Sequence, residues 1–113
     1  MGLSTHVLDT AHGCPAAGMQ VTLYREATLL KTFTLNSDGR NPEGLLLSTA
    51  ELKAGMYRLV FDVADYFKAR GVMLPEPNFL NQVSLDFGIA NASEHYHVPL
   101  LVSPWSCSTY RGS

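Results

Sequence analysis

The sequence predicts an all-β protein, a sandwich or a small barrel, with one short helix. Short segments rich in β-branched and aromatic residues recur along the chain, and glycine, proline, asparagine and aspartate interrupt them repeatedly. That pattern is typical of sandwiches and barrels built from short strands. Only residues 62–71 depart from this rhythm, and there the spacing is helical.

The expected strands are short and separated by turn residues. In the second of them Val21 and Leu23 alternate with polar or aromatic neighbours, so one face of that strand should point into the core. The expected strands are Ser4–Asp9, Met19–Arg25, Leu30–Leu35, Gly44–Leu47, Met56–Val63, Gln82–Gly88, His95–Val102 and Ser106–Tyr110.

The expected helix covers about two turns. Asp62 could cap its start, and Gly71 can adopt the left-handed conformation just beyond its end. Residues at helical spacing between them are Tyr66, Phe67 and Arg70. The following residues, 72–78, contain two prolines and should form an irregular loop, because proline cannot donate to a sheet ladder.

Length and charge limit the classes of protein to consider. With 113 residues the chain should form one domain, residues 1–113. Charged residues make up 16% of it, below the roughly 25% of ordinary globular proteins, which indicates that some surface is buried in an oligomer. The net charge is −2 and the basic residues are scattered, which argues against nucleic acid or an anionic membrane as a partner.

The cysteines and the hydropathy bear on the compartment. Cys14 and Cys107 are too few for a disulfide scaffold and are expected to be free thiols. No apolar run approaches the roughly 20 residues that span a bilayer, and the N-terminus lacks the regions of a signal peptide. We expect a soluble, cytoplasmic protein, with a periplasmic location as the alternative if the chain is a processed precursor.

His95 and His97 flank Tyr96 in an expected strand, so they point to the same face with Cβ atoms about 6.5–7 Å apart. Histidine titrates near neutral pH, which suits general acid and base catalysis or metal binding. A plain exposed polar face is the alternative. A metal would need a third ligand, and no spacing here matches a zinc pattern, so no metal is predicted. Candidates for that ligand are His6, His12, Asp9 and Glu94.

Three further features could belong to a site. His6 lies in an expected strand, where it would by itself be an ordinary half-buried histidine. Arg40 follows the turn residues Asp38 and Gly39, which would display it at a strand edge or leave it as a solvated loop arginine. The last residues directly follow a strand and could be held in a site, whereas most termini fray. The sequence contains no catalytic serine elbow, phosphate loop or dinucleotide fingerprint.

Four segments together resemble the transthyretin-like 5-hydroxyisourate hydrolases. They span the chain from end to end, and the terminal Tyr-Arg-Gly-Ser is the most diagnostic signature of that family. The segments are Leu3–Asp9 with Gly13–Ala16, Thr34–Arg40, His95–Leu101 and Ser108–Ser113.

The resemblance implies a fold and an assembly. The fold would be a transthyretin-like sandwich of two four-stranded antiparallel sheets with one short α-helix. The assembly would be a homotetramer, in which edge strands pair to form dimers and two dimers enclose a channel. The active sites would lie in that channel at the dimer–dimer interface, lined by more than one subunit.

The resemblance also implies a reaction and a set of residues. The enzyme would hydrolyse a C–N bond in the cyclic amide of 5-hydroxyisourate and yield 2-oxo-4-hydroxy-4-carboxy-5-ureidoimidazoline, a step in urate degradation to allantoin, without a cofactor. The implied catalytic residues are His6, Arg40, His97 and Ser113, and the residues implied to bind substrate with them are Tyr110, Arg111 and Gly112. His12 and His95 receive no role.

Two other functions stay open from the sequence. The first is a transthyretin-like protein that binds a small aromatic ligand in the same channel without catalysis. Transthyretin, however, has non-catalytic residues where this chain has His6, Arg40 and His97. The second is a metal-binding β protein that uses His95, His97 and a further histidine.

Overall fold

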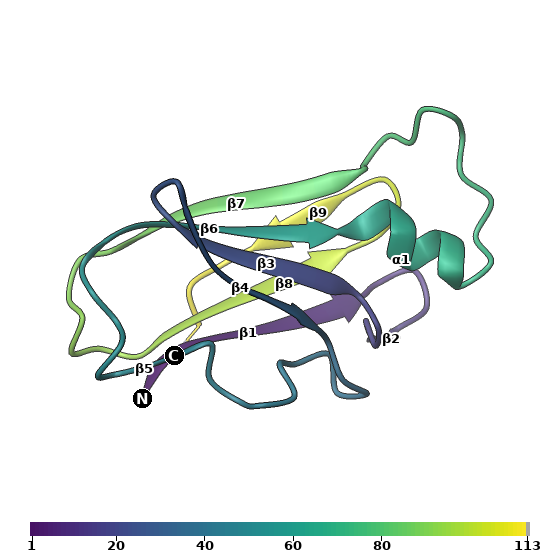
Figure 1. Ribbon diagram of the computed structural model, residues 1–113. Coiled ribbons are helices and arrows are strands. Elements are labelled where there is room, and N and C mark those ends of the chain that lie inside the picture. The colour runs from purple at the N-terminus through teal and green to yellow at the C-terminus, as the bar shows by residue number, and fades with distance from the viewer. Residues whose placement is uncertain (113) are drawn as a thin grey trace.

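The computed structural model describes residues 1–112 as a sandwich of two β-sheets with one short helix (Figure 1). No helix within the described residues is long and apolar enough to cross a membrane. In chain order the elements are β1 (Gly2–Asp9), β2 (Cys14–Pro15), β3 (Gln20–Arg25), β4 (Thr28–Thr34), β5 (Leu47–Ser48), β6 (Gly55–Asp62), α1 (Val63–Ala69), β7 (Gln82–Ile89), β8 (Tyr96–Val102) and β9 (Cys107–Thr109).

One strand pairing determines which residues meet at the surface. The first sheet has the order β2-β1-β8-β9, with β5 also paired to β1, and the second has the order β4-β3-β6-β7. All pairings are antiparallel except that of β1 with β8, which is parallel. In this pair Ser4 lies opposite His97, and His6 lies opposite Pro99. The first strand of the chain therefore lies beside the strand that leads into the C-terminal region.

The core lies between the two sheets and follows the alternation of the strands. Val21 and Leu23 of β3 are fully buried, as the sequence predicts. Leu3 and Val7 of β1 are also fully buried, while Ser4 and His6 between them are partly exposed. Because burial of one such aliphatic side chain contributes about 1.5–3 kcal/mol, the apolar face of β1 holds this strand in register and turns its polar face outward.

The predicted fold class and the helix are confirmed. Helix α1 begins directly after Asp62, and Gly71 has a φ of +82° just beyond its end. The Asp62 carboxylate does not cap the helix, however, because it accepts a hydrogen bond from Gln82 Nε2 at 2.7 Å instead. Because Gln82 of the neighbouring strand β7 binds the carboxylate, this group does not accept hydrogen bonds from the first N–H groups of the helix.

The first sheet differs in detail from the expectation. It has five strands and one parallel pairing, where four antiparallel strands were expected. The strand expected at Gly44–Leu47 is wrong, because Gly44 closes a turn in which its N–H bonds to the Asn41 carbonyl, and pairing starts only at Leu47. The short strand β2 was not expected, because Pro15 reads as a turn residue. Proline is tolerated there because β2 is an edge strand.

Candidate active site

Strands β1 and β8 present two histidines on one outward face. In the parallel register, His6 lies two positions beyond Ser4, and Ser4 lies opposite His97. Both histidines are partly exposed, while the intervening Thr5 and Val98 are buried. Because alternate residues of a strand share a face, His6 and His97 project from adjacent strands toward the same region of the surface.

A tight loop before β5 brings Arg40 to this region. Asn36 Oδ1 accepts hydrogen bonds from the backbone N–H groups of Asp38 at 2.9 Å and Arg40 at 3.1 Å, which closes the loop on itself. The Gly39 carbonyl then accepts a hydrogen bond from Val7 N–H at 3.0 Å, beside His6 in β1. A Cβ at Gly39 would lie 2.6 Å from the Val7 carbonyl oxygen, and its φ is +72°, so glycine is required for this approach.

The charge of Arg40 acts on both histidines. Burial lowers the pKa of His6 from 6.5, and the Arg40 charge lowers it further, while the backbone and the carboxylate of Asp38 oppose part of this effect. Burial also lowers the pKa of His97, and the nearby Arg40, His6 and His95 lower it further. Both imidazoles are therefore neutral at pH 7, which leaves each with a lone pair and an N–H group.

The C-terminal residues are held against β8. The N–H of Gly112 donates to the His97 carbonyl at 2.7 Å. The Arg111 guanidinium donates to Glu94 Oε1 at 3.0 Å and to the His95 carbonyl at 3.2 Å, and it lies 4.1 Å from the centre of the Tyr96 ring. A Cβ at Gly112 would come within 2.8 Å of the His97 ring, so only glycine passes there without displacing the histidine.

The structure brings some of the predicted site residues together and separates others. His6, Arg40, His97 and Gly112 meet at one end of the sandwich. Within the single chain Tyr110 and Arg111 instead line a mainly apolar groove of about 310 Å³ beside β7 and β8. Ser113 lies outside the described residues.

The sequence model of the HIUase/Transthyretin family matches residues 3–112. The chain belongs to this family. It is 55% identical to the 5-hydroxyisourate hydrolase of Pseudomonas aeruginosa, over 98% of this chain and 90% of that protein. The solved structure of Klebsiella pneumoniae 5-hydroxyisourate hydrolase superimposes with a TM-score of 0.83 at 36% identity, and the match covers 100% of both chains.

A longer protein of known structure also contains this fold. The crystal structure of an (S)-allantoin synthase superimposes with a TM-score of 0.94 at 45% identity. The match covers 99% of this chain and 43% of that one, so this chain spans less than half of the longer protein.

Ser4, which lies beside the histidines, was not singled out by the sequence. Ser4 Oγ lies 2.8 Å from His97 Nδ1, and His95 Nε2 lies 3.4 Å from the same hydroxyl. Ser4 could have been suspected because it shares a strand face with His6. The parallel register that brings it to His97 leaves no local signal in the sequence. Among residues 1–112, no group of three or more His, Cys, Asp or Glu side chains is arranged to hold a metal ion.

Proposed function

We propose that this chain hydrolyses 5-hydroxyisourate by opening a C–N bond of its cyclic amide. The observation that carries this proposal is a pair of histidines of lowered pKa beside Arg40, in a chain 55% identical to a named 5-hydroxyisourate hydrolase. The same identity disfavours the alternative of a carrier without catalysis. The product would be 2-oxo-4-hydroxy-4-carboxy-5-ureidoimidazoline.

The reaction requires three catalytic functions from the protein. A base must activate water for attack on the ring carbonyl, donors must stabilise the oxyanion that forms, and the leaving nitrogen must receive a proton. His6 and His97 divide the base and substrate-orienting roles. Their lowered pKa values support these roles, because only a neutral imidazole can accept the proton of water at pH 7.

Arg40 binds and polarises the oxygens of the substrate. Its planar guanidinium stays charged and presents two parallel donors to a flat acceptor edge. The exposure of its side chain and its effect on both histidines support this role. No step requires a metal or an organic cofactor in this scheme.

The C-terminal residues close the site in this proposal. The hydrogen bond from Gly112 to the His97 carbonyl supports the role, because it holds the C-terminal segment against the strand that carries this histidine. Tyr110 and Arg111 contribute to substrate binding from a neighbouring subunit, since in their own chain they line a groove beside β7 and β8.

We further propose that the chain forms a homotetramer, a dimer of dimers with the active sites at the dimer–dimer interface. The open outer strands β7 and β9 support edge pairing, which would also remove strand edges that otherwise invite aggregation. The position of the histidines on an outward sheet face supports completion of the site by a second dimer.

The decisive assay follows the decay of freshly generated 5-hydroxyisourate by ultraviolet absorbance after urate oxidase has acted on urate. The protein should accelerate this decay, His97→Ala should lose the acceleration, and Thr32→Ala on the exposed face of β4 should keep it. Absence of acceleration by a folded oligomer would instead support a ligand carrier.

A further inference from the structure

A chain of hydrogen-bonding groups leads from the backbone of β1 to His97. The Gly2 N–H donates to His95 Nδ1 at 3.2 Å. His95 Nε2 lies 3.4 Å from Ser4 Oγ, and Ser4 Oγ lies 2.8 Å from His97 Nδ1. All four groups are buried or half-buried, and both strands of the parallel β1–β8 pair contribute to the chain.

The first donor in this chain determines the direction of the others. A backbone N–H can only donate, so His95 Nδ1 must carry a lone pair, and the proton of the His95 ring is on Nε2. That N–H points to Ser4 Oγ as an acceptor. The Ser4 hydroxyl has its own proton to donate to His97 Nδ1, and in that arrangement the proton of a neutral His97 is on Nε2.

We infer that Ser4 and His95 are positioning residues that hold His97 in the tautomer with its proton on Nε2, so that His97 acts as a neutral hydrogen-bond donor and His6 acts as the base. This inference rests on the proposed hydrolysis and deepens it, because it assigns the two histidines different roles. Neither Ser4 nor His95 contacts the substrate in this scheme.

The chemistry is balanced with this division of roles. His6 takes a proton from water while the water oxygen bonds to the ring carbonyl carbon, and the carbonyl electron pair moves to an oxygen held by Arg40 and the His97 Nε2–H. When the C–N bond breaks, the departing nitrogen takes the proton from His6. His97 keeps its proton throughout, as suits a neutral imidazole that polarises a carbonyl.

The surroundings of both rings support this division. Burial lowers the pKa of His97, and three charged or titratable neighbours lower it further: Arg40 from the loop before β5, His6 from β1 and His95 just before β8. Burial lowers the pKa of His6 and the Arg40 charge lowers it further, while Asp38 opposes part of this effect. A neutral His6 keeps a lone pair on one ring nitrogen, with which it can accept a proton.

The direct test is the tautomer of His97 in the full-length wild-type protein. Two-bond ¹H–¹⁵N correlation spectra of protein labelled at histidine separate protonated from unprotonated ring nitrogens, and the signals of His97 are identified by their loss in His97→Ala. We expect a neutral His97 with the proton on Nε2 at pH 7.5. A proton on Nδ1 would overturn the inference.

The kinetic test compares Ser4→Ala with Ser4→Thr, which restores the hydroxyl, and with Thr32→Ala as a control away from the site. Loss of one hydrogen bond that orients the donor should lower kcat about tenfold in Ser4→Ala and leave KM within about twofold. Ser4→Thr should recover most of kcat. A Ser4→Ala protein with unchanged kcat and an unchanged His97 tautomer would contradict the inference.

The His95→Asn variant tests the hydrogen bond between His95 and Ser4. Asparagine can still accept from the Gly2 N–H through its carbonyl but places no donor near Ser4, so both Nδ1 and Nε2 protonation of His97 should become detectable. An unchanged, single tautomer would remove His95 from the chain. If the wild-type protein fails to hydrolyse 5-hydroxyisourate, the proposed function fails, while the spectra still decide the tautomer.

Discussion

At the scale of single residues, Arg40 combines a permanent positive charge with a planar pair of donors. The two properties can be separated by substitution, because lysine keeps the positive charge but lacks the planar pair of N–H donors. Burial and this charge together lower the pKa values of His6 and His97, whereas the proposed recognition of a flat heterocycle depends on the planar pair of donors.

Arg40→Lys should therefore lose at least tenfold in kcat/KM, about 1.4 kcal/mol of transition-state stabilisation, while the protein still folds. Steady-state kinetics and circular dichroism measure the two effects. Near-normal turnover would show that charge alone is sufficient at this position.

The pH dependence of kcat/KM tests the charge itself. The base must be neutral, so activity should be present at higher pH and be lost as the pH falls through a pKa below 6.5. In Arg40→Gln the charge that lowers both histidine pKa values is absent, so the acidic limb of the profile should move to higher pH. A limb that stays in place would mean that burial alone determines these pKa values.

At the scale of elements, a buried carboxylate joins the helix to the first strand. Asp9 at the end of β1 is fully buried and accepts hydrogen bonds from Tyr66 Oη of α1 at 2.7 Å and His12 Nδ1 at 2.6 Å. Burial raises the pKa of Asp9, but these hydrogen bonds outweigh it and lower the pKa. The contact joins α1 to the end of β1, at the end of the sandwich away from the two chain termini (Figure 1).

Tyr66→Phe should lower the free energy of unfolding by about 1.5–3 kcal/mol, since it removes a hydrogen bond to a buried charged acceptor. Urea denaturation gives this value, and Tyr24→Phe on the outward face of β3 is a matched control with a smaller expected effect. Hydrolysis by the folded Tyr66→Phe protein should be close to normal. Equal stability of the two variants would show that the Asp9 contact contributes little.

In the proposed active site, the C-terminal residues 110–112 cover a strand face that would otherwise be open. Removal of Arg111 to Ser113 should abolish hydrolysis without unfolding the sandwich, because the hydrogen bonds of Arg111 and Gly112 go to the partly exposed residues at the start of β8 and just before it and not to the core. Gly112→Ala should impair activity more mildly by displacing the His97 ring, which a Cβ would approach to 2.8 Å. Full activity of the truncated protein would assign this segment another purpose.

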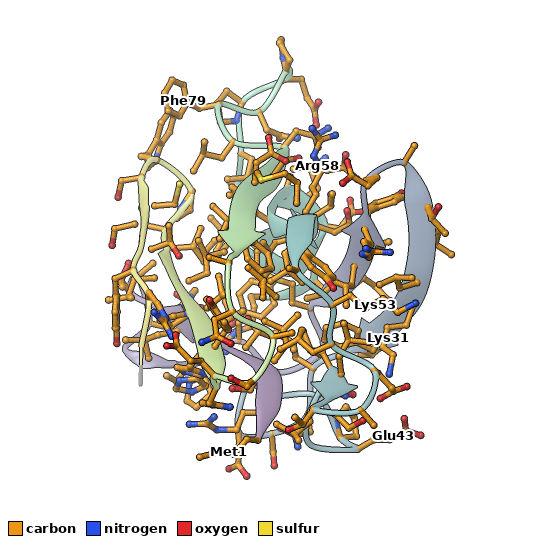
Figure 2. The ribbon with its side chains drawn as sticks, turned by 90° about the vertical axis from the view of Figure 1, so that its left-hand side faces the viewer. Met1, Lys31, Glu43, Lys53, Arg58 and Phe79 are labelled. Carbon is orange, nitrogen blue, oxygen red and sulfur yellow. The ribbon has the colours of Figure 1, made fainter. Side chains whose placement is uncertain are left out.

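At the scale of the whole molecule, one subunit leaves much apolar surface uncovered. Phe79 and Trp105 are 67% and 60% exposed and contact each other with ring centres 5.8 Å apart. Figure 2 shows Phe79 projecting from one end of the sandwich, with Met1 at the opposite end. Large exposed aromatic side chains are typical of interaction surfaces, and they support the proposed homotetramer.

If the site is completed across the dimer–dimer interface, specific activity should fall when the tetramer dissociates on dilution. Sedimentation velocity measures the fraction of tetramer, and the hydrolysis assay measures specific activity over the same range of protein concentration. Both should fall to half at the same concentration. A fully active isolated subunit would contradict a shared site.

The cytoplasmic location expected from the sequence stays a prediction.

The sequence by itself determined the fold class, most of the strands, the helix at 63–69 and the motifs that carry the family. These follow from local chemistry, because alternation, turn residues and helix signals act over a few neighbours. Only the tertiary structure decided that β1 and β8 pair in parallel, which sets Ser4 beside His97 and His6 close by. Such contacts join residues about ninety positions apart, and their register depends on packing of the whole core, which no local pattern specifies.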